Sequence, residues 1–313
     1  MHSNHNLLHK RPYAHIWGRL WIAFISLAVV FITGKQPAHA DPLLWNTPAN
    51  QQSCPVGESA VWAEYEGGAE CIRYFFAGDI NDAPFVFFRM YGDRGVSMGK
   101  PPEDIANNTV AEQRAIAERK AIELGLPVII LARPGTYGSS GDHRERRQKS
   151  EFLAINAALN EITQKHRIER LVLSGHSGGA TAAAAVLTLG RDDVACAILT
   201  SGAFALLERA QRLRERNGKD PIPGVDLTGI SNPYDPLEHI AGITDDPQRI
   251  ILVIGNSQDS STPFDLQRRF ASALADAGHR VSLIEQAAHG PKFHNLRGAI
   301  GYTAIEHCAE AMD

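Results

Sequence analysis

The 313-residue sequence predicts an α/β protein built on a doubly wound, mostly parallel sheet. Short apolar runs, of the length and character of strands buried on both faces, alternate along the chain with longer segments of helical pattern. A glycine-rich turn joins one of these runs directly to an alanine-rich helix. Strands separated by helices form parallel units, and right-handed crossovers then place helices on both faces of the sheet.

The elements follow in order along the chain. The first two strands are expected at 60–66 and 71–76, as a hairpin around Gly67-Gly68. Further strands are expected at 84–90, 126–131, 170–174, 194–199, 249–254 and 280–284. Helices are expected at 108–125, 152–166, 178–189, 206–216, 263–277 and 294–311. Gly125 suits a helix C-cap and Ser150 an N-cap, because glycine tolerates left-handed backbone and a serine hydroxyl accepts from the first turn.

Residues 1–40 have the order of a secretory signal peptide. Basic residues precede the apolar run 20–32, and Ala38-His39-Ala40 follows it. The run is shorter than the roughly 20 residues that span a bilayer, which favours cleavage after Ala40 over a retained anchor. We therefore expect an exported protein, secreted or periplasmic, with residues 41–313 as one catalytic domain.

Charge and composition limit the classes of binding partner that we expect. The chain is 44% hydrophobic and 21% charged, which is ordinary for a globular protein. Residues 1–40 hold four basic and no acidic residues, so their removal would change the net charge from −4 to −8. An acidic body argues against a nucleic-acid partner. We also expect no cofactor, because no cysteine or histidine spacing suggests zinc.

Export permits disulfides between the four cysteines. Cys54 and Cys71 flank a short segment and are the expected pair, which would contribute about 3 kcal/mol. Cys196 lies in an apolar strand, where a buried free thiol is favoured over a bridge to Cys308.

The sharpest motif is Gly175-His176-Ser177-Gly178-Gly179, which has the pattern G-x-S-x-G between an apolar strand and a helix. A tight turn there would expose the Ser177 hydroxyl, and the two outer glycines would leave room for neighbouring backbone. The helix N-terminus and the Gly178 N–H would face developing negative charge. An incidental serine in a glycine-rich turn is the alternative.

A serine nucleophile needs a base and a group that orients the base, in the chain order Ser, acid, His. Asp259 follows the strand at 249–254, although it could merely cap the next helix. His289 follows the last strand beside a flexible glycine and is the preferred base. His294 is its competitor but is expected to begin the final helix, and Glu285 is a weaker alternative acid.

Two loops complete the expected site. The loop 91–95 should supply a second oxyanion donor, for which the N–H of Asp93 is the candidate, with Tyr91 lining the site. The glycine-rich loop 132–143 lacks the ending of a P-loop, so it predicts a turn beside the pocket. The basic residues that follow are expected to form a solvated face; they are Arg144, Arg146, Arg147 and Lys149. The interval 203–247 is longer than a crossover needs, which indicates either a cap insertion beside the site or a surface excursion.

These motifs resemble the α/β-hydrolase superfamily over nearly all of 41–313. The segment from Asn232-Pro233-Tyr234-Asp235-Pro236, through Asp259 and Pro263-Phe264, to His289 is similar to dienelactone-hydrolase-like and prolyl-oligopeptidase-like catalytic domains. The resemblance implies a triad of Ser177, Asp259 and His289.

The resemblance does not transfer a substrate. Tyr91-Gly92 stands where many relatives have His-Gly, and no propeller domain precedes the hydrolase segment. The expectation is therefore an esterase that acts on small carboxylic esters through an acyl-enzyme. Two alternatives stay open, a serine peptidase or aminopeptidase and a non-catalytic binding protein that uses the interval 203–247.

Overall fold

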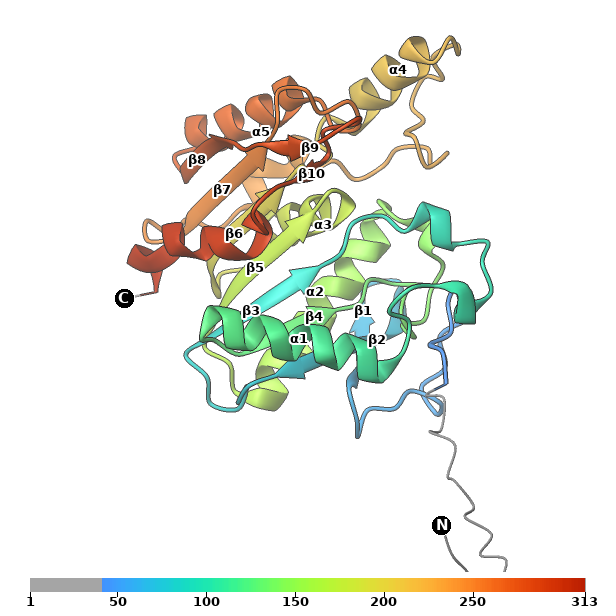
Figure 1. The fold of residues 1–313 in the computed structure, drawn as a ribbon, viewed down its shortest axis with the longest axis vertical. Helices are drawn as coiled ribbons and strands as arrows, with labels where there is room; N and C mark the ends of the chain where they lie inside the picture. The colour runs from blue at the N-terminus through green and yellow to red at the C-terminus, as the bar shows by residue number, and fades with distance from the viewer. Residues whose placement is uncertain (1–40, 313) are drawn as a thin grey trace, which may run out of the picture. The chain divides into compact units, whose positions relative to one another are not determined.

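The computed structural model describes residues 41–312, so the signal peptide expected at 1–40 lies outside the described residues. An eight-stranded sheet forms the centre of this part of the chain, in the order β1-β2-β4-β3-β5-β6-β7-β8 (Figure 1). Its strands are β1 (Ala60–Tyr65), β2 (Gly68–Ala77), β3 (Phe85–Met90), β4 (Val128–Leu131), β5 (Arg170–His176), β6 (Val194–Thr200), β7 (Ile250–Gly255) and β8 (Arg280–Glu285). Strand β2 is antiparallel to both β1 and β4. Strands β3 to β8 are all parallel to their neighbours among themselves. The predicted doubly wound, mostly parallel sheet is confirmed.

Helices cover both faces of this sheet. The helices are α1 (Val110–Leu124), α2 (Lys149–His166), α3 (Gly178–Thr188), α4 (Leu206–Arg216), α5 (Phe264–Asp276) and α6 (Ile300–Thr303). Helices α2, α3 and α5 pack on one face, and α1, α6 and the 3-10 helix η5 (Ala304–Ala311) pack on the other. Each face therefore has its own apolar core, as the continuous apolar strands predict.

Most helix boundaries follow from local chemistry. Thr109 caps α1 in a reciprocal capping box with Glu112, and Gly125 ends the helix at φ 65°. Helix α2 begins after Gln148, so Ser150 lies inside its first turn and is not the N-cap. Among residues 41–312, no helix has both the length and the apolar character that crossing a bilayer requires.

The C-terminal region departs from the expected single helix over 294–311. A two-stranded hairpin of β9 (Ala288–His289) and β10 (Asn295–Leu296) comes first, and helical structure starts only at Ile300. Gly290 and Pro291 lie in the turn of this hairpin, where proline and glycine favour a reversal of the chain. His294 therefore lies in a hairpin and does not begin a helix.

Two disulfides crosslink the described chain. Cys54 and Cys71 are bonded, as expected, and hold the segment before β1 to β2. Cys196 is bonded to Cys308, so the prediction of a free thiol at Cys196 is wrong. The apolar run around Cys196 was a correct sign of a buried strand, but it carried no information about η5, which packs against β6 and brings Cys308 to it.

The interval between β6 and β7 holds α4, a loop over 217–235 and the 3-10 helix η4 (Pro236–Gly242). In Figure 1, α4 and this loop stand out beyond the arrowheads of the parallel strands. The interval thus extends from the edge of the sheet at which β5 and β7 end.

Candidate functional site

Ser177 lies in the turn between β5 and α3. Its backbone has φ 55° and ψ −122°, a region that non-glycine residues rarely adopt. The Ser177 N–H donates to the carbonyl of Thr200 on the neighbouring strand at 2.9 Å. The turn is therefore held by the sheet in a strained conformation.

The glycines around Ser177 are required by close backbone approach. A Cβ on Gly175 would overlap the carbonyl of Gly179, and a Cβ on Gly179 would lie 2.5 Å from the carbonyl oxygen of Met90. A Cβ on Gly92 would lie 3.1 Å from the Cβ of Ser177. Both outer glycines of the motif thus have the steric role that the sequence pattern suggests.

Asp259 follows β7 and is buried. Its Oδ1 accepts the N–H groups of Ser261 at 2.7 Å and Thr262 at 2.9 Å, and its Oδ2 accepts the hydroxyl of Thr262 and Nδ1 of His294, both at 2.8 Å. Burial alone would raise the pKa of Asp259, but the bond to His294 and its charge hold that pKa below its ordinary value. Asp259 both caps its turn and orients an imidazole, so the two roles considered for it coexist.

The imidazole bonded to Asp259 belongs to His294 and not to His289, the base expected from the sequence. His289 lies in β9 with an exposed side chain, paired in register with Asn295. The turn at Gly290 and Pro291 reverses the chain, and the carbonyl of Lys292 accepts from the N–H of Ser260 at 3.0 Å. This contact draws the far arm of the hairpin, which carries His294, against the Asp259 loop.

Two neighbours fix His294 near the serine. The carbonyl that accepts the Ser177 N–H belongs to Thr200, and Ser201 is the next residue. The Ser201 hydroxyl donates to the carbonyl of His294 at 2.9 Å. The ring of His176, which precedes Ser177, lies 4.9 Å from the His294 ring between centroids. Burial, followed by the charge of His294, lowers the pKa of His176 to about 3. His176 is therefore a neutral packing partner of His294.

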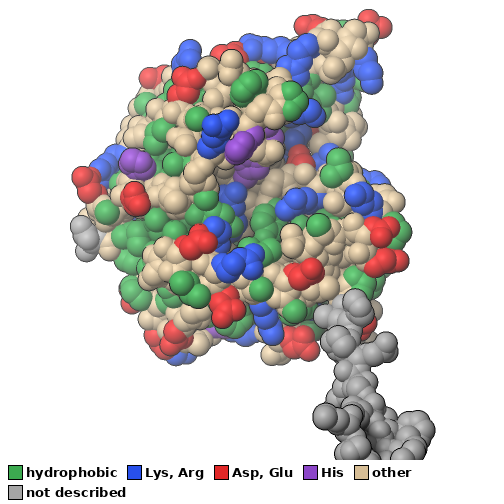
Figure 2. Space-filling view, viewed as in Figure 1, with side chains coloured by type: hydrophobic (Ala, Val, Ile, Leu, Met, Phe, Trp, Pro, Cys, Tyr) green, Lys and Arg blue, Asp and Glu red, His purple; other side chains and the backbone are tan. Residues whose placement is uncertain are grey.

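The surface over this edge is hollowed. Figure 2 shows a hollow beside the His side chains near β9 and β10, with Lys and Arg side chains around it. Such a depression at the carboxyl ends of parallel strands is the usual place for a ligand in a doubly wound sheet.

Two backbone N–H groups are available as anion donors. Gly178 is the first residue of α3, so its N–H has no acceptor within the helix. The N–H of Asp93, in the loop after β3, donates to no acceptor in residues 41–312. The two loops are adjacent, because a Cβ on Gly178 would overlap Oδ1 of Asp93. Both expected oxyanion donors thus lie beside Ser177.

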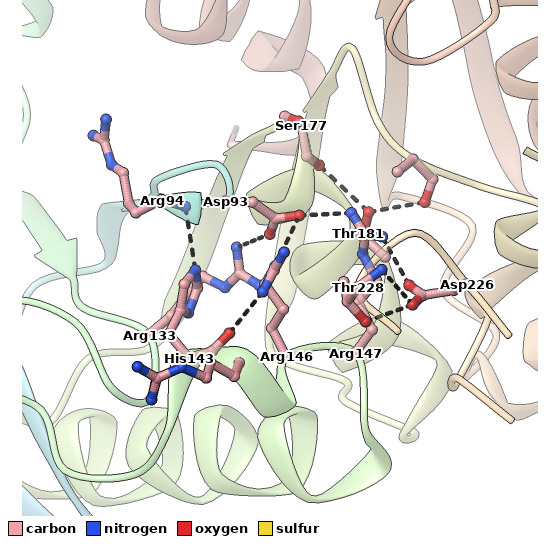
Figure 3. Close-up of polar contacts among 12 residues, drawn as sticks. Asp93, Arg94, Arg133, His143, Arg146, Arg147, Ser177, Thr181, Asp226 and Thr228 are labelled. Atoms are coloured by element: carbon pink, nitrogen blue, oxygen red, sulfur yellow. Dashed lines mark hydrogen bonds and ion pairs between the residues drawn. The ribbon is translucent and has the colours of Figure 1, made fainter. Parts of the chain in front are cut away.

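The side chain of Asp93 is the centre of a buried ion cluster (Figure 3). It pairs with Arg133 at 2.9 Å, Arg147 at 2.6 Å and Arg146 at 3.4 Å. Burial alone would raise the pKa of Asp93, but the three guanidinium groups hold it well below its ordinary value. Three cations thus compensate the charge of the carboxylate that lies beside the Asp93 N–H.

The cluster continues away from Ser177. Glu151, in the first turn of α2, pairs with Arg133 at 2.7 Å, and Asp226, in the loop after α4, pairs with Arg147 at 2.9 Å. Arg147 is buried, with 3% of its side chain exposed, and Arg146 is exposed by only 12%. The expected solvated face is therefore wrong for these two residues and correct for Arg144, which is 61% exposed.

The glycine-rich loop 132–143 is buried beside this cluster, as the sequence predicts for a turn near the pocket. His143 accepts the N–H of Arg94 at 3.2 Å through Nε2. Burial, followed by the charge of Arg133, lowers the pKa of His143 to about 3, so its ring can accept this bond as the neutral form. The ion cluster was missed because a run of arginines on a loop is usually solvated; the acidic residue Glu151, close after it in sequence, was the one available signal.

No family model matches the chain, and no curated protein matches it. Solved structures do match. An esterase from Pyrococcus furiosus is similar with TM-score 0.54 and 14% identity, over 86% of this chain and 96% of the esterase. Est1E from Butyrivibrio proteoclasticus has TM-score 0.51 and 14% identity, over 82% and 98%.

A prolyl oligopeptidase from Galerina marginata has TM-score 0.52 and 13% identity, over 81% of this chain. The chain spans only 35% of that peptidase, and 38% of an acylaminoacyl peptidase from Pyrococcus horikoshii. The likeness shows the α/β-hydrolase fold.

Proposed function

We propose that the protein is a serine hydrolase that cleaves carboxylic ester bonds with Ser177 as nucleophile, His294 as base and Asp259 as the residue that orients it. The observation that carries the proposal is the hydrogen bond from His294 to Asp259 at the sheet edge where Ser177 occupies its strained turn. Chain order and placement agree with a hydrolase triad.

Each group has one step in the proposed mechanism. Because Nδ1 of His294 is committed to Asp259, Nε2 is the atom left to accept the Ser177 proton during attack. Asp259 stays ionised through its lowered pKa and stabilises the imidazolium. The N–H groups of Gly178 and Asp93 stabilise the oxyanion. His294 then protonates the departing alcohol, and water releases the acid from the acyl-enzyme by the same route.

Esters are favoured over peptides as substrates. The similar Pyrococcus esterase and Est1E are matched over nearly their whole length, whereas the prolyl oligopeptidase is matched over about a third. Two disulfides are compatible with export, which we propose on the signal-like pattern of residues 1–40.

A fluorophosphonate probe tests the nucleophile. The wild-type protein should be labelled and Ser177→Ala should not be, with circular dichroism to confirm that the variant is folded. Faster turnover of p-nitrophenyl acetate than of aminoacyl-nitroanilides would support the ester assignment. Equal labelling of both proteins would remove Ser177 from the mechanism, and absence of labelling in folded wild type would favour the binding-protein alternative.

A further inference from the structure

Arg209, on α4, is a buried cation that has no anionic partner among residues 41–312. It is 8% exposed, and its Nε donates to the carbonyl of Ser261 at 2.8 Å. Its Nη1 is buried without a hydrogen-bond partner, and Nη2 makes no hydrogen bond within residues 41–312. Buried guanidinium groups are normally paired, so the unpaired end calls for a ligand.

The carboxylates in this region are already paired with other groups. In the ion cluster, the three arginines described above face three carboxylates, those of Asp93, Glu151 and Asp226. Asp259 is already bonded to His294. Arg209 has no ion pair of its own in the described chain, so none of these carboxylates balances its charge.

The charge of Arg209 is felt by carboxylates on both sides of the site. Burial, followed by repulsion from Arg147, lowers the pKa of Arg209 to about 9, while Asp93, Asp226 and Asp259 act in the opposite direction. Asp93 adjoins Gly178, and Asp259 binds the histidine, so the guanidinium is within the influence of both. The guanidinium of Arg209 is therefore protonated and positively charged at neutral pH.

The position of Arg209 in the chain also connects it to the site. Helix α4 belongs to the interval between β6 and β7, which extends beyond the ends of the parallel strands (Figure 1). The carbonyl that anchors its Nε belongs to Ser261, whose N–H is bonded to Asp259. Nη1 is closed off from solvent, so Nη2 is the nitrogen left to donate to a carboxylate oxygen.

We propose that Arg209 is a specificity-determining residue that binds a carboxylate of the substrate. On the proposed function above, on which this inference rests, the preferred substrates are esters that carry a carboxylate near the scissile bond. Through Arg209, the interval between β6 and β7 thus selects the substrate by charge.

Two esters of matched length test this. Mono-4-nitrophenyl succinate ends in a carboxylate where 4-nitrophenyl butyrate ends in a methyl group. Wild type should prefer the succinate in kcat/KM, and Arg209→Met should lower the ratio of the two kcat/KM values by about 10- to 100-fold. Arg209→Lys should retain part of the preference. Arg212→Met is the control, because Arg212 is a more exposed cation on the same helix, paired with Glu208 and Asp265.

Calorimetry with succinate separates this inference from the proposed function. Folded Ser177→Ala protein should bind succinate, and adding Arg209→Met should abolish binding. An unchanged ratio in Arg209→Met, or no succinate binding to Ser177→Ala, would overturn the anion site while esterase activity persists. Arg209-dependent succinate binding in a protein that neither cleaves esters nor reacts with the probe would overturn the proposed function alone.

Discussion

The turn that carries Ser177 and the hairpin that carries His294 supply the two reacting groups of the proposed triad, and they are built differently. The turn is fixed by backbone contacts that only glycine permits, at Gly175 and Gly179. The hairpin has an exposed β9 residue and is held mainly by the contacts of Lys292 and His294 with the loops after β7 and β6.

This difference explains which residue could be found in advance. Steric requirements at a tight turn act between residues that are close in sequence, so the pattern around Ser177 reveals them. The path of the chain after β8 depends on long-range contacts. The number of residues between β8 and a histidine therefore does not show whether His289 or His294 approaches Asp259.

Replacing each of the two histidines with alanine is the test with the largest expected effect. His294→Ala should lower kcat/KM for p-nitrophenyl acetate by about 10³- to 10⁵-fold, because Ser177 loses its proton acceptor. His289→Ala, five residues away on an exposed position of the same hairpin, is the matched control and should retain activity. Steady-state kinetics on both purified variants decides it, and the reverse result would restore His289 as the base.

Asp93→Asn probes the loop after β3, which lies against the turn that carries Ser177. It leaves Arg133, Arg146 and Arg147 without their shared carboxylate, so the free energy of unfolding should fall by about 3–5 kcal/mol at pH 6. Asp142→Asn, at an exposed pair with Arg144, is the control and should cost no more than about 1 kcal/mol. Urea unfolding of both variants measures the difference.

The same variant has a signed pH dependence. The folded state lowers the pKa of Asp93, so its contribution is fully present above its ordinary pKa, near 4, and is lost as pH falls through the lower folded value. The gap between wild type and Asp93→Asn should therefore narrow below about pH 4. A gap that stays constant from pH 6 to pH 3 would contradict the assigned charge of Asp93.

Most of the fold could be predicted from the sequence, because apolar runs and helical periodicity report burial locally. The eight strands and five of the six expected helices lie where the pattern places them, within a few residues at their ends. The sixth failed because the sequence after Ala288 contains a short hairpin of only two-residue strands, which is below the length at which alternation is visible.

The positions of the residues in the proposed site were predictable only in part. Ser177, Gly178, Asp93 and Asp259 were placed by their position after strands, which parallel topology brings to one edge. The buried charges could not be predicted in this way, because the burial of Arg147 depends on Asp226, which is 79 residues away in sequence. The bond between Cys196 and Cys308 spans 112 residues and is hidden for the same reason.

That bond gives the smallest effect and tests whether the C-terminal region depends on its tether. Cys196→Ala/Cys308→Ala should lower the free energy of unfolding by about 3–4 kcal/mol, since the crosslink closes a long loop in the unfolded chain. Cys54→Ala/Cys71→Ala opens a loop of only 17 residues and should cost less in thermal unfolding. If both pairs cost the same, loop length does not set the stabilisation. If the first pair costs nothing, the packing of η5 against β6 holds the C-terminal region without the bond, and this region would be as self-sufficient as the turn at Ser177.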